Sequence, residues 1–129
     1  MPEKVKEYYL LAVQDLNVRM VNNHPQWYNH VVNLPTQQQA VYTTLLLDYQ
    51  VKTEGFSGYL ASSFGMFASQ ALSNLEKIGS IEHFNVLQNV LNSLNGEPIE
   101  DLSHYDKQYQ AIEHENLDDL LESFLEENA

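Results

Sequence analysis

The chain has 129 residues, 43% of them hydrophobic and 11% aromatic, which predicts one globular domain that can bury a core of its own. Its formal net charge of −12 argues against direct binding to nucleic acid or to an anionic membrane, because both would repel it. It contains no cysteine, which excludes disulfides, thiolate nucleophiles and cysteine-ligated metals.

Apolar side chains recur at helical spacing along the first part of the chain. A first helix is expected over residues 2 to about 20, with Pro2 and an acidic residue in its first turn. A short helix should follow over residues 25–34, because the residue before Pro35 avoids the α-helical region. A third helix is expected over about residues 36–53.

A break is expected after this third helix, in the stretch DYQVKTEGFSGYLASS. It holds Gly55 and Gly58, two of only five glycines in the chain, and glycine allows a positive φ and close backbone approach. Phe56 and Tyr59 are three residues apart, so on a helical turn both point to the same side. We therefore predict a structural helix–helix corner at these four residues, with both aromatic rings locked into the core.

Further helical segments follow the corner. Residues 67–78 form one apolar stripe, with Gly79 expected just past the end of that helix. Ser80 should cap the next helix, which is expected to close at Asn95-Gly96. No strand-type alternation persists anywhere, so the predicted fold is all-α, a single compact domain of about six or seven helices spanning residues 1–129.

The charge is concentrated in residues 97–129, which hold eleven acidic residues and one lysine and carry −10 of the net −12. A helix is expected over residues 102–112, followed by a last helix capped by Asn116. On a helical wheel the last helix is apolar on one half and purely acidic on the other, which fits either a solvated face or a recognition face. The candidate partner-binding residues are Asp118, Asp119, Glu122 and Glu126, flanked by Glu115 and Glu113.

A set of motifs runs through the middle of the chain: Leu34-Pro35, Val41-Tyr42, Gln50-Val51, Glu54-Gly55-Phe56, Tyr59, Ser62-Ser63, Ala71-Leu72 and Leu75-Glu76-Lys77-Ile78-Gly79. These residues resemble the signature of the DNA-mimic protein family described in Neisseria. Thr53-Glu54 stands where that family has Asn-Gly, and Gly58 replaces a glutamine. The resemblance implies an acidic protein that sequesters a transcription factor and forms a dimer. It carries over no contact residue, because the shared motif is the Gly-Phe corner and not the acids.

The side chains capable of chemistry do not form a recognisable catalytic pattern. There is no Gly-x-Ser-x-Gly motif, no phosphate-binding glycine loop and no His-Glu-x-x-His motif. His104, Asp106, Glu113, His114 and Glu115 could in principle ligate a metal, but adjacent residues on a helix point away from one another. We therefore expect no catalytic residue, no metal, no cofactor and no enzymatic activity.

Two functional hypotheses from different classes remain. In the first, the protein is a DNA mimic whose carboxylates stand in for phosphates on the basic surface of a DNA-binding protein. Carboxylates at i and i+4 on a helix lie about 6 Å apart along the axis, comparable with the charge spacing along a nucleic-acid strand. In the second, it is an immunity or antitoxin-type inhibitor of a basic toxin or nuclease. A third possibility, a domain that is acidic without such a function, would have the same composition.

Both hypotheses imply a basic protein as partner, with no direct contact to nucleic acid or to a membrane. A homodimer would agree with the family resemblance. Residues 1–14 contain no apolar run long enough for a signal peptide or a membrane span, so the expected location is the cytoplasm.

Overall fold

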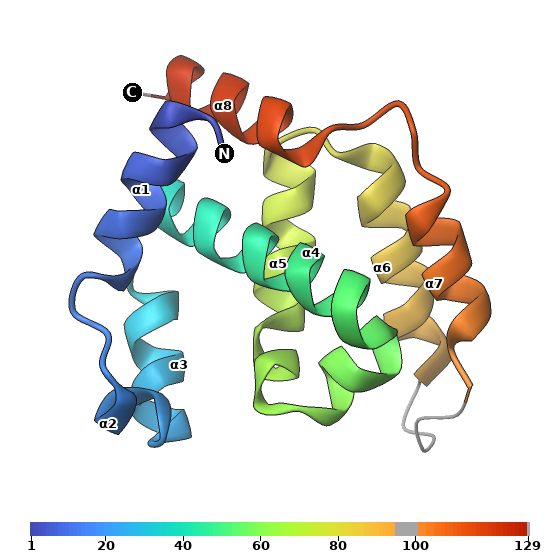
Figure 1. The fold of residues 1–129 in the computed structure, drawn as a ribbon, viewed down its shortest axis with the longest axis horizontal. Coiled ribbons are helices and arrows are strands. Elements are labelled where there is room, and N and C mark those ends of the chain that lie inside the picture. The colour runs from blue at the N-terminus through green and yellow to red at the C-terminus, as the bar shows by residue number, and fades with distance from the viewer. Residues whose placement is uncertain (95–100, 129) are drawn as a thin grey trace.

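The computed structural model describes residues 1–94 and 101–128, and every regular element within them is a helix (Figure 1). The elements are α1 (Glu3–Val13), α2 (Val18–Val21), α3 (His24–Val32), α4 (Thr36–Ala61), the 3-10 helix η1 (Ser63–Phe67), α5 (Ala68–Lys77), α6 (Ile81–Leu94), α7 (Ser103–Gln110) and α8 (Leu117–Glu127). The predicted all-α fold is confirmed. None of these helices is long and apolar enough to cross a membrane.

The first predicted helix is divided in two, which is why the described residues hold eight α-helices. The imidazole Nε2 of His30 donates a hydrogen bond to the carbonyl oxygen of Ala12 at 3.0 Å and so satisfies one of the free carbonyls at the end of α1. Asn17 then starts α2, because its side-chain oxygen accepts a hydrogen bond from the amide of Met20 at 2.9 Å. An asparagine that can cap a new helix competes with continuation of the old one, and apolar spacing alone does not reveal this.

The long helix α4 crosses the middle of the molecule and contacts α1, α5, η1, α7 and α8 (Figure 1). Residues 40–44 of α4 are buried without interruption, so this part of the helix is covered on all sides. The main core forms around it, with Val41, Leu47 and Val51 at most 1% exposed. The helix thus provides the framework on which the C-terminal helices are placed.

A second, smaller core lies under the N-terminal helices and is largely aromatic. Trp27 is at its centre, with its ring 5.2 Å from that of Phe67 in an edge-to-face arrangement. The indole Nε1 of Trp27 donates to the hydroxyl of Tyr42 on α4 at 3.1 Å. This contact ties α3 to the central helix.

The break predicted in the middle of the chain is a kink inside α4. Gly55 has a φ of 71°, a left-handed conformation that glycine adopts without steric cost. Phe56 and Tyr59, which follow it, are 0% and 1% exposed in the main core, whereas Gly58 has helical geometry. Two helical segments thus meet at Gly55, where the corner was predicted, and the second runs to Ala61 before η1 begins.

Gly79 ends α5 with a φ of 81°, and its amide and that of Ser80 bond back to the last turn of α5 at 3.1 and 2.9 Å. This left-handed helix end agrees with the position predicted for the glycine. The predicted close of the next helix at Asn95-Gly96, and the acidic residues Glu97 and Glu100, lie outside the described residues.

Candidate functional site

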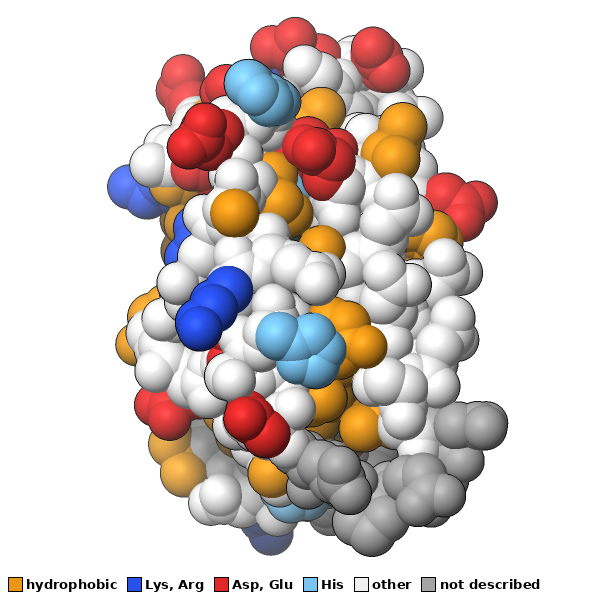
Figure 2. All heavy atoms as spheres, turned by 90° about the vertical axis from the view of Figure 1, so that its right-hand side faces the viewer, with side chains coloured by type: hydrophobic (Ala, Val, Ile, Leu, Met, Phe, Trp, Pro, Cys, Tyr) orange, Lys and Arg blue, Asp and Glu red, His pale blue; other side chains and the backbone are white. Residues whose placement is uncertain are grey.

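The acidic C-terminal part packs across one end of the molecule. In Figure 1, α8 lies along the upper edge beside the first turn of α1, and the link from α7 arches up to meet it. Leu117, Leu121 and Leu125 are at most 7% exposed and fix the inner side of α8 to the core. Figure 2 shows acidic side chains gathered toward the same upper end. The candidate surface is therefore carried by a rigid, well-packed helix and the link before it.

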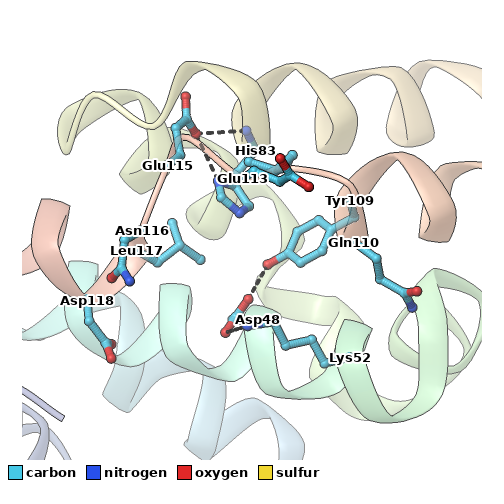
Figure 3. A pocket seen from close by; sticks show the side chains of 11 residues that line it. Asp48, Lys52, His83, Tyr109, Gln110, Glu113, Glu115, Asn116, Leu117 and Asp118 are labelled. Carbon is cyan, nitrogen blue, oxygen red and sulfur yellow. Dashed lines mark hydrogen bonds and ion pairs between the residues drawn. The ribbon is translucent and has the colours of Figure 1, made fainter.

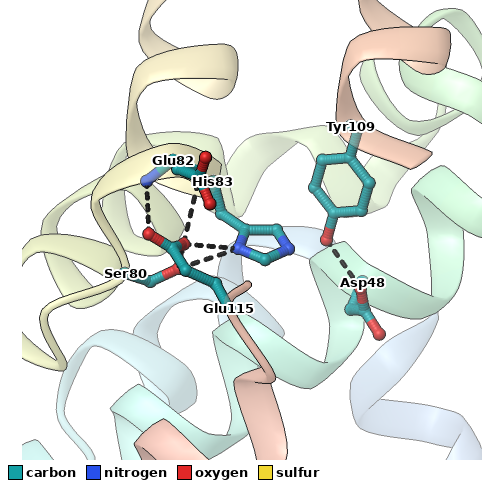
Figure 4. Close-up of polar contacts among 6 residues, drawn as sticks. All are labelled: Asp48, Ser80, Glu82, His83, Tyr109 and Glu115. Carbon is teal, nitrogen blue, oxygen red and sulfur yellow. Dashed lines mark hydrogen bonds and ion pairs between the residues drawn. The ribbon is translucent and has the colours of Figure 1, made fainter. Parts of the chain in front are cut away.

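Glu115, in this link, caps α6. Its carboxylate accepts hydrogen bonds from the amide nitrogens of Glu82 and His83, at 2.6 and 3.2 Å, in the first turn of that helix. It also accepts from the hydroxyl of Ser80 at 2.7 Å and from Nδ1 of His83 at 2.8 Å (Figure 4). The free amides and the positive end of a helix dipole both favour an anion at this place. Glu115 therefore has a structural role that its prediction as a flanking partner contact did not include.

This arrangement also corrects the role predicted for Ser80. The residue stands just before α6, but its hydroxyl bonds to Glu115 and contacts Nδ1 of His83 at 2.9 Å, while Glu115 satisfies the free amides of the helix. Burial acts to raise the pKa of Glu115, but the hydrogen bonds from Glu82, Ser80 and His83 outweigh it and hold the pKa below its ordinary value. The cap is thus a carboxylate at neutral pH, and its bonds are charge-assisted.

Glu122, on α8, caps α1. Its Oε2 accepts a hydrogen bond from the amide of Val5 at 3.2 Å, although the two residues are 117 positions apart in the chain. The side chain was predicted to lie free on the solvated face of the last helix, and it is instead half-buried against the first turn of α1. The amide of Val5 is one of those that a helix leaves without an internal partner at its beginning.

Asp106, on α7, caps the second half of α4. Its Oδ1 accepts a hydrogen bond from the amide of Phe56 at 2.8 Å, directly after the kink. A Cβ atom on Gly55 would lie 2.6 Å from Oδ2 of Asp106, so the glycine leaves the space that this carboxylate fills. The kink in α4 is in effect a second helix start, and Asp106 supplies its cap.

These three residues, Asp106, Glu115 and Glu122, form the set that we call the capping carboxylates. Sequence reasoning missed this role because each partner is at least 32 positions away, beyond the reach of any local capping motif. A second set of acidic side chains has no such role: among the described residues they make no hydrogen bond or ion pair. These open carboxylates are Glu113, Asp118, Asp119, Glu126 and Glu127.

A cavity of about 340 Å³ adjoins the open carboxylates, between α4, α6, α7 and the link to α8 (Figure 3). Its walls carry four carboxylates and one lysine. Lys52 lies 3.0 Å from Oδ2 of Asp48, and the hydroxyl of Tyr109 donates to Oδ1 of the same aspartate at 2.7 Å. Burial, together with the Asp48 charge and this hydrogen bond, raises the pKa of Tyr109, so it remains a neutral phenol.

Three of the residues that line the cavity, Glu113, Glu115 and Asp118, were among the acids that the sequence indicated, and the Asp48–Lys52 pair has the i,i+4 spacing of a helical ion pair. His83, which lies 5.0 Å from the ring of Tyr109, had no such signal in the sequence. Over residues 1–94 and 101–128, no group of three or more histidine, aspartate or glutamate side chains is placed to hold a metal ion.

The comparison with protein families decides the classification. A model of the family described as DMP19-like protein matches residues 32–129, which include α4 and every element after it. The chain belongs to the DMP19-like protein family. The resemblance to the DNA-mimic family is thereby confirmed, and membership suggests a DNA-mimic role. No curated protein matches the chain, and no solved structure does. The matched region contains all of the capping and open carboxylates.

Proposed function

We propose that this protein is a non-enzymatic DNA mimic that occupies the basic surface of a DNA-binding protein such as a transcription factor. The observation that carries the proposal is the set of open carboxylates on α8 and the link before it, on a helix whose inner side is fixed to the core. Family membership supports the same function and favours it over the immunity or antitoxin alternative. We also propose a cytoplasmic location and a homodimer, the latter implied by the family resemblance.

The geometry of α8 suits an imitation of phosphates. Asp119 and Glu126 are both exposed and seven residues apart, which places them on one face at about 10.5 Å along the axis. Glu122 lies between them, and its bond to a single amide of α1 leaves its negative charge in place. The face therefore presents a row of charges at helical intervals, with no lysine or arginine on α8.

The test is a competition experiment. The partner would be captured from a lysate at low salt, released at raised salt, and mixed with its DNA site and this protein in a gel-shift titration. We expect the protein to displace the DNA, because both ligands need the same basic surface. A ternary complex of partner, DNA and protein would contradict the proposal.

Charge-reversal variants locate the surface. Asp119→Lys with Glu126→Lys should abolish displacement, because attraction is replaced by repulsion. The control is a single reversal, Asp15→Lys, at an exposed acid on the link between α1 and α2, at the opposite end of α1 from α8 (Figure 1). The control should displace DNA nearly as well as the unaltered protein.

A further inference from the structure

The cavity beside the open carboxylates has walls that accept hydrogen bonds but offer few donors. The side chain of His83 is only 6% exposed, and its ring points into the cavity toward Tyr109 and Asp48 (Figure 4). Its Nδ1 is occupied by Glu115, whereas its Nε2 has no hydrogen-bond partner among the described residues. This nitrogen is not among the fully buried atoms without a partner, so it is accessible from the cavity and can bind a ligand or water.

The hydrogen-bond network fixes which nitrogen of His83 carries the proton. An ionised carboxylate only accepts hydrogen bonds, so in the contact with Glu115 the proton is on Nδ1. Ser80 donates its one hydroxyl hydrogen to the same carboxylate, which leaves the Ser80 oxygen as an acceptor as well. In the neutral ring Nε2 is then an acceptor that faces the cavity.

Most of the other walls have the same character, although the side-chain amides of Gln110 and Asn116, which also line the cavity, can donate as well as accept. Tyr109 donates its hydroxyl hydrogen to Asp48, so the phenol oxygen can only accept from a ligand. Lys52 is the one cationic residue of the lining, and it is already bound to Asp48. Glu113 and Asp118, two of the open carboxylates, also line the cavity and have no partner among residues 1–94 and 101–128. A matching ligand must bring positive charge and several N–H donors.

We propose that this cavity receives the guanidinium group of an arginine side chain from the basic surface of the sequestered protein, an inference that rests on the proposed function. Arginine has five N–H donors in a planar fork and is more weakly hydrated than lysine, so it suits acceptors on several walls of a partly enclosed site. The volume of about 340 Å³ is at the lower end of the range of roughly 300–1,000 Å³ for small-molecule sites, which fits one inserted side chain. Arginine is also one of the residue types most often found as a hot spot of protein interfaces.

The experiment uses the full chain and two small probes, N-acetyl-arginine methylamide and N-acetyl-lysine methylamide, titrated at matched chloride concentration and followed by NMR. We expect saturable shifts at Nε2 of His83 and in the amides of residues 113–118, with the arginine probe bound more tightly. Glu113→Gln with Asp118→Asn should weaken binding of the arginine probe by about tenfold, roughly the contribution of one charge-assisted hydrogen bond. The matched control, Glu126→Gln with Glu127→Gln, removes the same charge outside the cavity lining and should change binding less than about twofold.

Three results would overturn the inference: equal binding of the two probes, equal weakening by both pairs of variants, or no shift at Nε2 of His83. The proposed function fails separately. If the protein displaces DNA from its partner and the Glu113/Asp118 variant does so equally well, the cavity is not the arginine site while the DNA mimic stands. If the arginine probe binds in the cavity but a ternary complex forms, the guanidinium preference stands and the DNA mimic fails.

Discussion

The capping and open carboxylates come from the same short, acidic part of the chain, yet they act in different ways. Asp106, Glu115 and Glu122 face the starts of three helical segments and accept hydrogen bonds from amides that those helices leave free. The open set, represented by Asp119 and Glu126, extends from the outer side of α8 into solvent. A count of acids along the sequence treats the two sets alike, and only the position of each carboxylate relative to a helix start separates them.

This division explains how a segment with a net charge of −10 can pack against the rest of the chain. Each capping carboxylate is attracted by the positive end of a helix dipole, which offsets part of the repulsion among the acids. The same contacts fix α7, the link and α8 to α4, α6 and α1 respectively. The acidic segment thus closes the fold with one set of side chains and presents the other set on a stable surface. Variants of the two sets should differ most clearly in their effect on the free energy of unfolding.

The largest loss of stability is expected at Phe56, whose amide is held by Asp106. Its ring is fully buried and lies 5.6 Å from that of Tyr109. Phe56→Ala should lower the free energy of unfolding by about 3–5 kcal/mol, because a large cavity replaces the ring. Denaturant unfolding measures this, and a midpoint equal to that of the unaltered protein would show that the capped kink is not part of the stable core.

The next largest effect concerns the space beside Gly55 that the capping carboxylate of Asp106 occupies. Gly55 and Gly79 both have a positive φ, but a Cβ atom at Gly55 would meet Asp106, whereas one at Gly79 would meet no atom within 4 Å. Gly79→Ala should cost about 1–2 kcal/mol for the backbone conformation alone. Gly55→Ala should cost about 1–3 kcal/mol more, because the Asp106 cap must shift and because a φ of 71° with a ψ of 173° is a conformation that only glycine adopts readily. Equal losses in the two variants would mean that Asp106 contributes little to the kink.

A third prediction concerns the charge of a capping carboxylate. Glu115→Gln should lower the free energy of unfolding at neutral pH by about 1–3 kcal/mol, since a neutral amide replaces the anion at the start of α6. The pKa of Glu115 is lower in the folded state than its ordinary value of 4.5, so its stabilising contribution is fully present above that pH and is lost as the pH falls through the lowered pKa. The difference between the two proteins should therefore shrink below about pH 4.5.

Urea unfolding of both proteins across this pH range provides the measurement. Glu127→Gln is the matched control, because this exposed side chain makes no bond among the described residues. Its difference from the unaltered protein should be small at every pH. A Glu115→Gln difference that stays constant from pH 7 to pH 3 would show that the cap does not depend on the charge.

The sequence was sufficient for the features that depend on local patterns. Helical spacing gave the all-α fold, Asn116 caps α8 through the amide of Asp119 at 3.0 Å, and Gly79 ends α5. It was not sufficient for long-range partners. The capping roles of Glu115 and Glu122 could not be predicted, because nothing near either residue indicates that its partner is a helix start from a distant part of the chain. A helical wheel of α8 gives the direction of each side chain, but it does not show which other helix packs beside that side chain.

The smallest effect on stability, and the clearest effect on binding, is expected for the open set. Asp119→Asn with Glu126→Gln should change the free energy of unfolding by less than about 0.5 kcal/mol, because both side chains are exposed and make no bond among the described residues.

The same variant should slow association with the basic partner at low salt, where attraction between exposed charges is strongest. As the salt concentration rises, the association rates of the two proteins should converge. Salt screens the additional attraction that the charges of Asp119 and Glu126 give the unaltered protein. Stopped-flow association at several salt concentrations measures this. Equal rates at low salt would assign the attraction to carboxylates other than Asp119 and Glu126. A large loss of stability would place these two residues with the capping set.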